Sequence, residues 1–462
     1  MFTLREYQET QIDGARMEIA RGIRRVLLQA PCGAGKTVMM ADMSARAKLR
    51  GNGTLFVVHR QELVDQSAAT FEAAGIPFGI IAAGYAPDYR QLIQIGSIQS
   101  VIRRLDKIPP PNVVILDECH HASANTWRKL LAALPDAVVI GLTATPARLG
   151  GQSLGDIFQS MILGPSVKDL ISWGNLAPFK YYAPPVAADL TGLRVQYGDF
   201  VQSEVAVRVD KSEIIGDLIA QYKKLAPGMR AVCYCVSVAH SQHTAAMFAE
   251  AGIPAAHIDG ESHDTIRRAA IEDFRAGKIK VLCNVDLISE GFDVPAMEAV
   301  ILARPTQSLT LHVQQSMRPM RPDKNNPDKV AVIIDHVGNV YRHGLPDEVR
   351  EWTLEPSKKK KNAASEFPIK QCPKCYAAHR PAPICPICGY KYPVAERSGP
   401  KERKGELTEV VDLERMQKRI EVGRAKNVQS LEQIAMRRGY APGWVIKLCD
   451  AKKIPFGESE AR

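Results

Sequence analysis

Short apolar runs, separated by longer segments of helical periodicity, recur along the first part of the chain. The runs fall at 26–28, 54–58, 92–95, 113–116 and 138–142. Their apolar residues are consecutive rather than alternating, which is typical of strands buried on both faces of a parallel sheet. The intervening segments predict helices on both sides of that sheet, with functional residues at the carboxyl ends of the strands.

A second set of apolar runs repeats this arrangement further along the chain. The rhythm weakens between about 150 and 215 and resumes at 231–236, 255–258, 281–283, 300–302 and 330–334. We therefore predict an α/β protein with two tandem parallel-sheet domains, at 1–185 and 186–350. The expected order then continues with a lysine-rich linker at 351–368, a cysteine cluster at 369–393 and a helical module at 400–462.

Bulk composition narrows the class of protein and its partners. The 462 residues suffice for two to four domains with buried cores. A net charge of +10 and a pI near 9.0 favour a polyanionic partner such as nucleic acid. The N-terminus has no signal-peptide pattern and no run approaches ~18 apolar residues, so we expect a cytoplasmic protein without a membrane partner.

The first apolar run leads into the segment APCGAGKT at 30–37, which a helical segment follows. This order of strand, turn and helix is typical of a phosphate-binding loop, in which small residues let backbone N–H groups close around a phosphate. Lys36 is expected to reach the β- and γ-phosphates, and the Thr37 hydroxyl to bind Mg²⁺. The usual pattern begins with glycine where this chain has Ala30, and the wrapping residues are Pro31, Cys32, Gly33, Ala34 and Gly35.

Two adjacent carboxylates, Asp117 and Glu118, follow the run at 113–116. Carboxylates at the end of a buried strand are costly unless they hold a metal or carry out acid–base chemistry. Together with a phosphate loop, Asp117 is expected to hold Mg²⁺, and Glu118 to orient and deprotonate an attacking water. The loop alone fits a kinase, a GTPase or a transporter ATPase, so the choice rests on the remaining motifs.

The segment DECH at 117–120 resembles the DExH box of superfamily 2 helicases. Further segments resemble the other motifs of that family, in the family's order, at 4–8, 58–66, 96–100, 141–146, 289–295 and 314–321. The resemblance covers roughly residues 1–345. It implies two RecA-like domains that bind ATP in the cleft between them.

The resemblance implies a role for several residues at the nucleotide. Gln8 matches the position that contacts the edge of adenine, and Arg5 lies near it in the same segment. In the second domain, Gly291 and Asp293 belong to the segment that resembles motif V. These four residues are therefore expected to bind ATP.

The segment at 314–321 resembles motif VI and includes Gln314, Arg318 and Arg321. In the family, such arginines close on the nucleotide and stabilise charge on the transferring phosphoryl group. Because Arg318 and Arg321 are three residues apart, a helix would present both on one face. Met317 stands where the family often has glycine.

The family resemblance also implies a nucleic-acid path across the tops of both domains. Arg60, Ser97 and Gln99 are the candidates for this path in the first domain. DNA, whether single-stranded, duplex or branched, is favoured by the likeness to repair-type helicases, and RNA stays open. The residues expected to couple hydrolysis to movement are His120, Thr143 and Thr145.

Four cysteines form two Cys-Pro-x-Cys pairs, at Cys372 and Cys375 and at Cys385 and Cys388. Each pair makes a tight knuckle, and four thiolates at this spacing suit tetrahedral Zn²⁺. So short a segment cannot build a core, so metal binding would supply much of its folding free energy. Redox-active pairs and an iron site are the alternatives.

The C-terminal module carries apolar residues at helical spacing. This spacing predicts an amphipathic helix that ends at Gly439 and a second helix after Pro442. The module resembles the small C-terminal part of bacterial and phage helicase-like proteins of the RadD type, which also carry cysteine clusters.

Together, these motifs predict a nucleic-acid-dependent ATPase that uses ATP, Mg²⁺ and Zn²⁺ and translocates along or unwinds DNA in repair, recombination or replication. The alternatives are an RNA helicase, a duplex translocase that does not unwind, the motor subunit of a restriction-type complex, and a clamp for which ATP is only a switch. An intact Glu118 and both arginines argue against the clamp.

Overall fold

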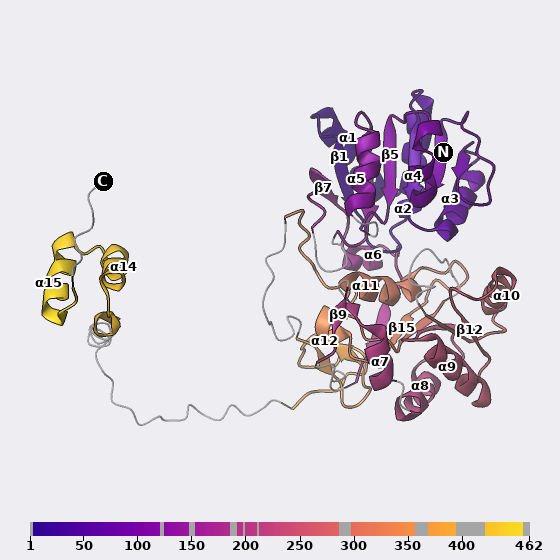
Figure 1. Ribbon diagram of the computed structural model, residues 1–462. Helices are drawn as coiled ribbons and strands as arrows, with labels where there is room; N and C mark the ends of the chain where they lie inside the picture. Colours follow the sequence, from indigo (N-terminus) through magenta and orange to yellow (C-terminus); the bar gives the residue numbers. More distant parts are fainter. Residues whose placement is uncertain are drawn as a thin grey trace. The chain divides into compact units, whose positions relative to one another are not determined.

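The computed structural model describes residues 3–120, 124–146, 153–184, 192–196, 199–209, 212–285, 297–355, 368–393 and 421–455. The chain forms two compact units, Met1–Tyr392 and Pro393–Arg462. The first unit contains both predicted parallel sheets and the cysteine cluster (Figure 1). Gly291 and Asp293 lie outside the described residues.

The first sheet has seven parallel strands in the order β3-β4-β2-β5-β6-β1-β7. The apolar runs of the sequence correspond to five of them, and the predicted parallel sheet is confirmed. The sequence did not predict the short strand β3 or the edge strand β7. The strands are β1 (Arg25–Gln29), β2 (Thr54–Val58), β3 (Gly79–Ile81), β4 (Ile93–Ser97), β5 (Val113–Asp117), β6 (Val138–Thr143) and β7 (Ser160–Leu163).

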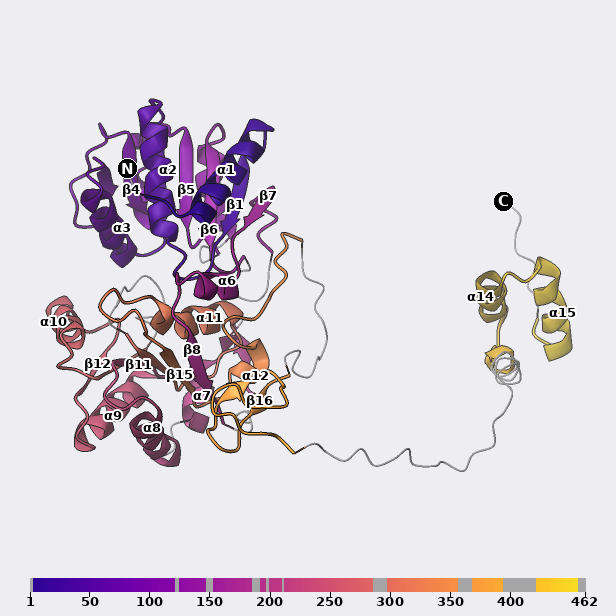
Figure 2. The same ribbon diagram turned by 180° about the vertical axis from the view of Figure 1, so that it is seen from behind.

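Helices cover both faces of this sheet because successive strand residues point to opposite sides. Val26 and Leu28 pack in one apolar cluster with α1–α3, whereas Leu27 packs in another with α4 and α5. Figures 1 and 2 view these two faces in turn. The covering helices are α1 (Glu6–Ala20), α2 (Lys36–Leu49), α3 (Gln61–Ala73), α4 (Ile98–Arg103) and α5 (Ala124–Ala133).

The second sheet has six parallel strands in the order β12-β13-β11-β14-β15-β8. Its edge strand β8 precedes the expected domain boundary at residue 185, yet pairs with β15 through Ala331↔Phe179. The chain therefore enters the second sheet earlier than the weakened rhythm suggested. The strands are β8 (Phe179–Tyr182), β11 (Ala231–Tyr234), β12 (Ala255–Ile258), β13 (Val281–Asn284), β14 (Ala299–Leu302) and β15 (Ala331–Asp335).

Helices and two short strands accompany the second sheet. Helix α6 (Val167–Ser172) precedes β8, and α11 (Leu309–Met317) follows β14. The short strands β9 (Val195–Gln196) and β10 (Asp199–Phe200) pair only with each other within the described chain. The other helices are α7 (Gln202–Val209), α8 (Ser212–Leu225), α9 (Val238–Glu250), α10 (Asp264–Arg275) and α12 (Val340–His343).

After β15 and α12 the chain returns to the first domain. Leu354 packs against the apolar cluster of the first sheet that includes Phe158. The Ser153 hydroxyl also donates a hydrogen bond to the Leu354 carbonyl oxygen. The segment 344–355, which follows the last strand and helix of the second domain, thus contacts the first domain through Leu354.

The cysteine-containing segment then packs on the second domain. Its strands β16 (Lys370–Gln371) and β17 (Ala378–His379) form an antiparallel pair. A bridge between Tyr182 and Ala377 joins this segment to the edge strand β8. Arg380 forms ion pairs with Asp347 and Glu348, at 3.0 and 3.1 Å, so its charge is compensated within the chain.

The second unit contains the two predicted C-terminal helices. Helix α14 (Val428–Arg438) ends at Gly439, whose left-handed backbone caps it, and α15 (Pro442–Lys452) follows. The rings of Tyr440 and Trp444 lie 4.7 Å apart within the apolar cluster of this unit. Within the described residues, no helix combines the length and the apolar composition that crossing a membrane requires.

We expect Gly141→Ala to destabilise the first domain. A Cβ at this position in β6 would overlap the Phe158 ring and lie 3.0 Å from Leu27 Cδ1. Overpacking of this kind costs about 1–3 kcal/mol, so the melting temperature should fall by roughly 2–12 °C. Gly260→Ala is the matched control, because nothing lies within 4 Å of that position. An unchanged melting temperature for Gly141→Ala would contradict the packing described for β6.

Candidate active site

The phosphate loop connects β1 to α2. Gly33 and Gly35 have φ values of +83° and +81°, in the left-handed region that favours glycine. A Cβ on Gly33 would lie 2.7 Å from Leu176 Cδ2, and one on Gly35 would lie 2.5 Å from Gln8 Nε2. Both the positive φ values and the lack of room for a Cβ atom therefore require glycine at Gly33 and Gly35. Helix α2 begins at Lys36, so its N-terminus faces the loop.

The start of α1 is hydrogen-bonded to this loop. Gln8 Nε2 donates to the Ala34 carbonyl oxygen at 2.9 Å, and Gln8 Oε1 accepts from the backbone N–H of Arg5 at 2.9 Å. The Tyr7 hydroxyl also donates to Ala34 O, at 3.0 Å, and accepts from Arg5 Nη1, at 3.0 Å. The segment expected to contact adenine is thereby fixed to the residues expected to hold the phosphates. The sequence did not single out Tyr7.

An ion pair joins the loop to the acidic pair at the end of β5. Lys36 Nζ lies 3.1 Å from Glu118 Oε1, and the two side chains are only 11% and 15% exposed. Burial lowers the pKa of Lys36, but the negative charges of Glu118 and other nearby groups outweigh it, so the pKa is raised. The lysine therefore stays protonated with the glutamate beside it.

The turn after β5 places Glu118 in an unusual backbone conformation. Its φ is +42°, which is uncommon for any residue other than glycine. Such conformations cost on the order of 1–3 kcal/mol and cluster at functional sites. Asp117 Oδ1 accepts a hydrogen bond from the backbone N–H of Glu118 at 2.9 Å. Asp117 is buried, and its negative charge also raises the pKa of Lys36.

The expected coupling residues form a hydrogen-bonded chain that starts at His120, whose ring lies beside Glu118. His120 Nδ1 lies 3.4 Å from Glu118 Oε2 and 2.8 Å from Thr143 Oγ1. Thr143 Oγ1 donates to the Thr145 carbonyl oxygen at 3.0 Å and accepts from the Thr145 N–H at 3.1 Å. The hydroxyl proton of Thr143 is thus donated to the Thr145 carbonyl oxygen. In the hydrogen bond between His120 and Thr143, the proton therefore belongs to His120 Nδ1, which donates to Thr143 Oγ1.

This chain continues into the second domain through Thr310. Thr145 Oγ1 donates to Thr310 Oγ1 at 2.9 Å, and both side chains are buried. Thr310 lies on α11, the helix that leads to Gln314 and the two arginines. The sequence contained no signal for Thr310, because a lone threonine at the start of a helix is unremarkable and its partner is 165 residues away.

The predicted arginine helix is shorter than expected. Helix α11 ends at Met317, a 3₁₀ turn spans Arg318–Met320, and Arg321 is already extended, with φ −63° and ψ 133°. Pro319 explains the change, because proline lacks the N–H that a continuing helix needs. The expectation of one α-helical face was therefore wrong. The charges of both arginines nevertheless act on the partly buried thiol of Cys32 in the phosphate loop.

An apolar cluster joins the loop to the second domain. Ala30 and Ala34 belong to the same buried cluster as Met317 and Met320. The two positions at which this chain departs from the usual motifs, Ala30 and Met317, are thus both buried in one cluster. Gln314 is also buried on α11. Cys32, in the same loop, is partly buried, and burial raises the pKa of its thiol.

The candidates for nucleic-acid contact lie at the carboxyl ends of β2 and β4. Arg60 precedes the first residue of α3, and Ser97 precedes the first residue of α4. Gln99 is exposed, and its Nε2 lies 3.4 Å from the His59 carbonyl oxygen. Ser97 is buried, so of these three its side chain is the least accessible to a strand.

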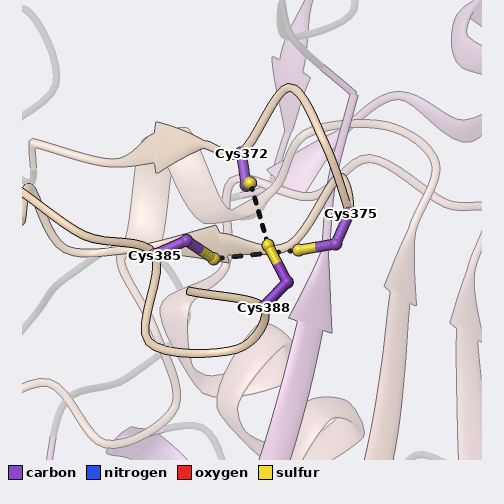
Figure 3. A group of neighbouring side chains, drawn as sticks. All are labelled: Cys372, Cys375, Cys385 and Cys388. Carbon is purple, nitrogen blue, oxygen red and sulfur yellow. Dashed lines mark hydrogen bonds between the residues drawn. The ribbon is translucent and has the colours of Figure 1, made fainter. Parts of the chain in front are cut away.

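The four cysteines of the two knuckles come together as the sequence predicted (Figure 3). Cys372 Sγ lies 3.6 Å from Cys388 Sγ, and Cys375 Sγ lies 3.7 Å from Cys385 Sγ. Tetrahedral zinc with Zn–S bonds of about 2.3 Å requires sulfur separations of about 3.8 Å. Burial raises the pKa of Cys372, but backbone N–H donors and neighbouring thiols outweigh it and lower the pKa to about 6, whereas burial raises the pKa of Cys375 to about 12. The number of sulfurs and their separations fit zinc.

The two knuckles share one hydrogen-bond pattern. In the first, Tyr376 N donates to Cys372 O at 2.8 Å; in the second, Gly389 N donates to Cys385 O at 3.0 Å. Both residues are left-handed, with φ values of +62° and +71°. Glycine adopts this conformation freely, whereas it costs tyrosine roughly 1–2 kcal/mol. Lys224 Nζ lies 4.2 Å from the Tyr376 ring centroid, a contact that contributes about 0.5–1 kcal/mol at exposed sites.

Comparison with protein families agrees with the two-domain architecture. Residues 1–148 match the family described as "Type III restriction enzyme, res subunit". Residues 210–323 match the family described as "Helicase conserved C-terminal domain". These two matches cover the phosphate loop, the acidic pair and the arginine segment.

Several curated proteins are similar to most of the chain. A 51.5 kDa protein of a Lactococcus phage is 38% identical over 397 residues, covering 85% of this chain and 84% of that protein. A Saccharomyces cerevisiae protein provisionally named ATP-dependent helicase IRC3 is 27% identical and covers 72% of this chain. The EcoAI endonuclease subunit of an Escherichia coli type I restriction enzyme is 24% identical and covers 76%. The chain spans 51% of the yeast protein and 49% of the E. coli subunit.

Solved structures share the fold. A fragment of a provisionally assigned HsdR subunit of a type I restriction enzyme from Vibrio vulnificus superposes with a TM-score of 0.60 at 21% identity, covering 74% of this chain and 66% of that one. The type ISP restriction-modification enzyme LlaBIII, solved bound to DNA, superposes with a TM-score of 0.53 at 17% identity. It covers 72% of this chain, which corresponds to 28% of LlaBIII.

We expect a double-mutant cycle to detect the hydrogen bond between Thr145 and Thr310. Either single valine substitution leaves a buried hydroxyl without its partner and should cost about 1–3 kcal/mol. The double variant should lose less than the sum of the two, by about 0.5–1.5 kcal/mol. Thermal unfolding measures both effects. A cycle that pairs Thr145→Val with Thr10→Val, at an exposed position in α1, should be additive; additivity for Thr145 and Thr310 would rule out the contact.

Proposed function

The chain belongs to superfamily 2 of the helicases, and from this premise we propose that it couples ATP hydrolysis to translocation on, or unwinding of, DNA. The observation that carries the proposal is the largely buried ion pair between Lys36 and Glu118, together with the charges of Arg318 and Arg321 of the second domain, which act on Cys32 of the same loop. In this arrangement, Lys36 would bind phosphate, Glu118 would act as the base, and the two arginines would supply positive charge. DNA repair, recombination or replication is the setting in which we expect this activity.

In the mechanism we propose, Lys36 exchanges Glu118 for a phosphate. Without nucleotide, the lysine satisfies its charge with the glutamate at 3.1 Å. A γ-phosphate would compete for the lysine, which releases the Glu118 carboxylate to orient and deprotonate the attacking water. The left-handed turn at Glu118 holds the carboxylate next to this position throughout.

Thr37 and Asp117 are the residues that would hold Mg²⁺, which would neutralise phosphate charge. Arg318 and Arg321 would stabilise the charge that develops on the transferring group, a contribution worth ~10³–10⁵ in rate in comparable systems. The chain His120–Thr143–Thr145–Thr310 would report the state of Glu118 to the second domain. Hydrolysis would in this way change how the two domains bind a strand.

Two other activities have support of their own. The similarity to restriction-enzyme subunits favours a motor that acts within a larger complex, and co-purification of a partner would identify it. RNA remains the alternative substrate. An ATPase assay across single-stranded, duplex and branched DNA and RNA, together with strand displacement on the same substrates, separates these activities from a simple duplex translocase.

We expect Lys36→Ala and Glu118→Gln each to abolish nucleic-acid-stimulated ATP hydrolysis. Loss of the base or of the phosphate ligand should lower the rate at least ~10²-fold, while the melting temperature shows that the fold survives. Glu9→Gln, at an exposed glutamate of α1, is the control and should keep full activity. Full activity in either site variant would overturn the mechanism.

We also propose that the cysteine cluster binds one structural zinc ion. Metal analysis of fresh protein should find close to one zinc per chain, and Cys385→Ser should lose it. Because metal binding supplies folding free energy, chelation should unfold residues 368–393 first. Cys119→Ala, a cysteine in the first domain, should retain the zinc. Protein that contains no near-stoichiometric zinc would refute the proposal.

A further inference from the structure

We propose that Tyr376 and the cavity beside it form a subsite on which one base of single-stranded nucleic acid stacks. The inference rests on the proposed function, since it requires a nucleic-acid substrate. It assigns a role to the first knuckle beyond holding a metal. The argument comes from the backbone of Tyr376, the cavity and the exposed ring.

The second knuckle shows that the fold needs no side chain at this position. Gly389 makes the same backbone hydrogen bond as Tyr376 and has nearly the same φ. Nothing lies within 4 Å of a Cβ built on Gly389, so only the left-handed conformation selects glycine there. Tyr376 adopts the strained left-handed conformation, which Gly389 adopts without strain. The exposed contact between Tyr376 and Lys224 stabilises the fold by less than this strain costs. The ring therefore has a use beyond the knuckle itself.

A cavity of about 310 Å³ lies between the first knuckle and the second domain. Its lining includes Tyr182 and Asp335, the last residues of β8 and β15, and carboxyl ends of parallel strands are the usual place for ligands. The side chains that give it aromatic and polar character are Tyr182, Gln221, Lys224, His336, Gln371 and Tyr376. Its volume is at the lower end for small-molecule sites and suits a single base.

The chemistry of this cavity favours a nucleic acid over a peptide. Tyr376 lines the cavity and is 44% exposed, so the residue is accessible to a ligand that enters the cavity. Lys224 beside the ring supplies a positive charge for the phosphate that accompanies a stacked base. Gln371 Nε2 donates to the Ala183 carbonyl oxygen at 2.6 Å, which fixes one amide at the cavity wall. Asp335 is the acidic residue among the described side chains of the lining, and its carboxylate accepts hydrogen bonds from the Tyr181 hydroxyl and from the backbone N–H groups of Val337 and Val340.

Tyr376→Gly separates this role from a structural one, because the two predict opposite results. If the ring stacks a base, affinity for a single-stranded oligonucleotide should fall by roughly 5- to 140-fold, the range for loss of one stacked base. Because strain is relieved, zinc retention against a chelator and the melting temperature should stay at or above wild type. Tyr376→Phe keeps the ring and should bind like wild type. Gly389→Ala measures the strain alone, lowering zinc retention without changing affinity.

Each result decides a separate question. Unchanged oligonucleotide affinity in Tyr376→Gly overturns the inference and points to a protein ligand for the cavity. A joint loss of affinity and zinc retention overturns it in favour of a structural ring. ATP hydrolysis at saturating nucleic acid should be unchanged in Tyr376→Gly, since this residue lies outside the nucleotide site. A wild-type protein whose ATPase does not respond to nucleic acid would instead refute the proposed function.

Discussion

A lysine and a glutamate that neutralise each other in a nearly closed site are the constraint on which the rest of this structure depends. Lys36 comes from the loop after β1 and Glu118 from the turn after β5, so their pairing requires both elements to be placed by one sheet. An isolated buried charge is expensive, and either side chain alone would have to be solvated or neutralised. The loop glycines and the left-handed turn at Glu118 are the local backbone features that make the pairing geometrically achievable.

The second domain completes this site through apolar as well as charged groups. Met317 and Met320 pack in the cluster that contains Ala30 and Ala34, next to the turn that carries Arg318. Where the family often has glycine, this chain has larger side chains that share one buried cluster. We interpret the two departures as one packing feature that fixes the arginine turn against the loop. The hydrogen bond between Thr145 and Thr310 is a polar contact across the same boundary.

Local patterns predicted the fold class and the family, and both are confirmed. Buried strands such as β2 and β5 were found because they are continuous apolar runs. The pairing of β8 with β15 was not predicted, because the two strands lie far apart in the sequence. The same reason hid Thr310, and the effect of Pro319 on the arginine helix was overlooked although it was visible. The roles of the site residues, zinc binding and the nucleic-acid partner stay predictions.

The return of segment 344–355 to the first domain has a mechanical consequence. The polypeptide already crosses between the domains before β8, and the contacts of Leu354 with the first domain make a second crossing. The first crossing is covalent, whereas the second depends on the noncovalent contacts of Leu354. The effective concentration of the two domains for each other stays high while these contacts hold. The two domains therefore cannot separate widely without breaking the contacts of Leu354 with the first domain.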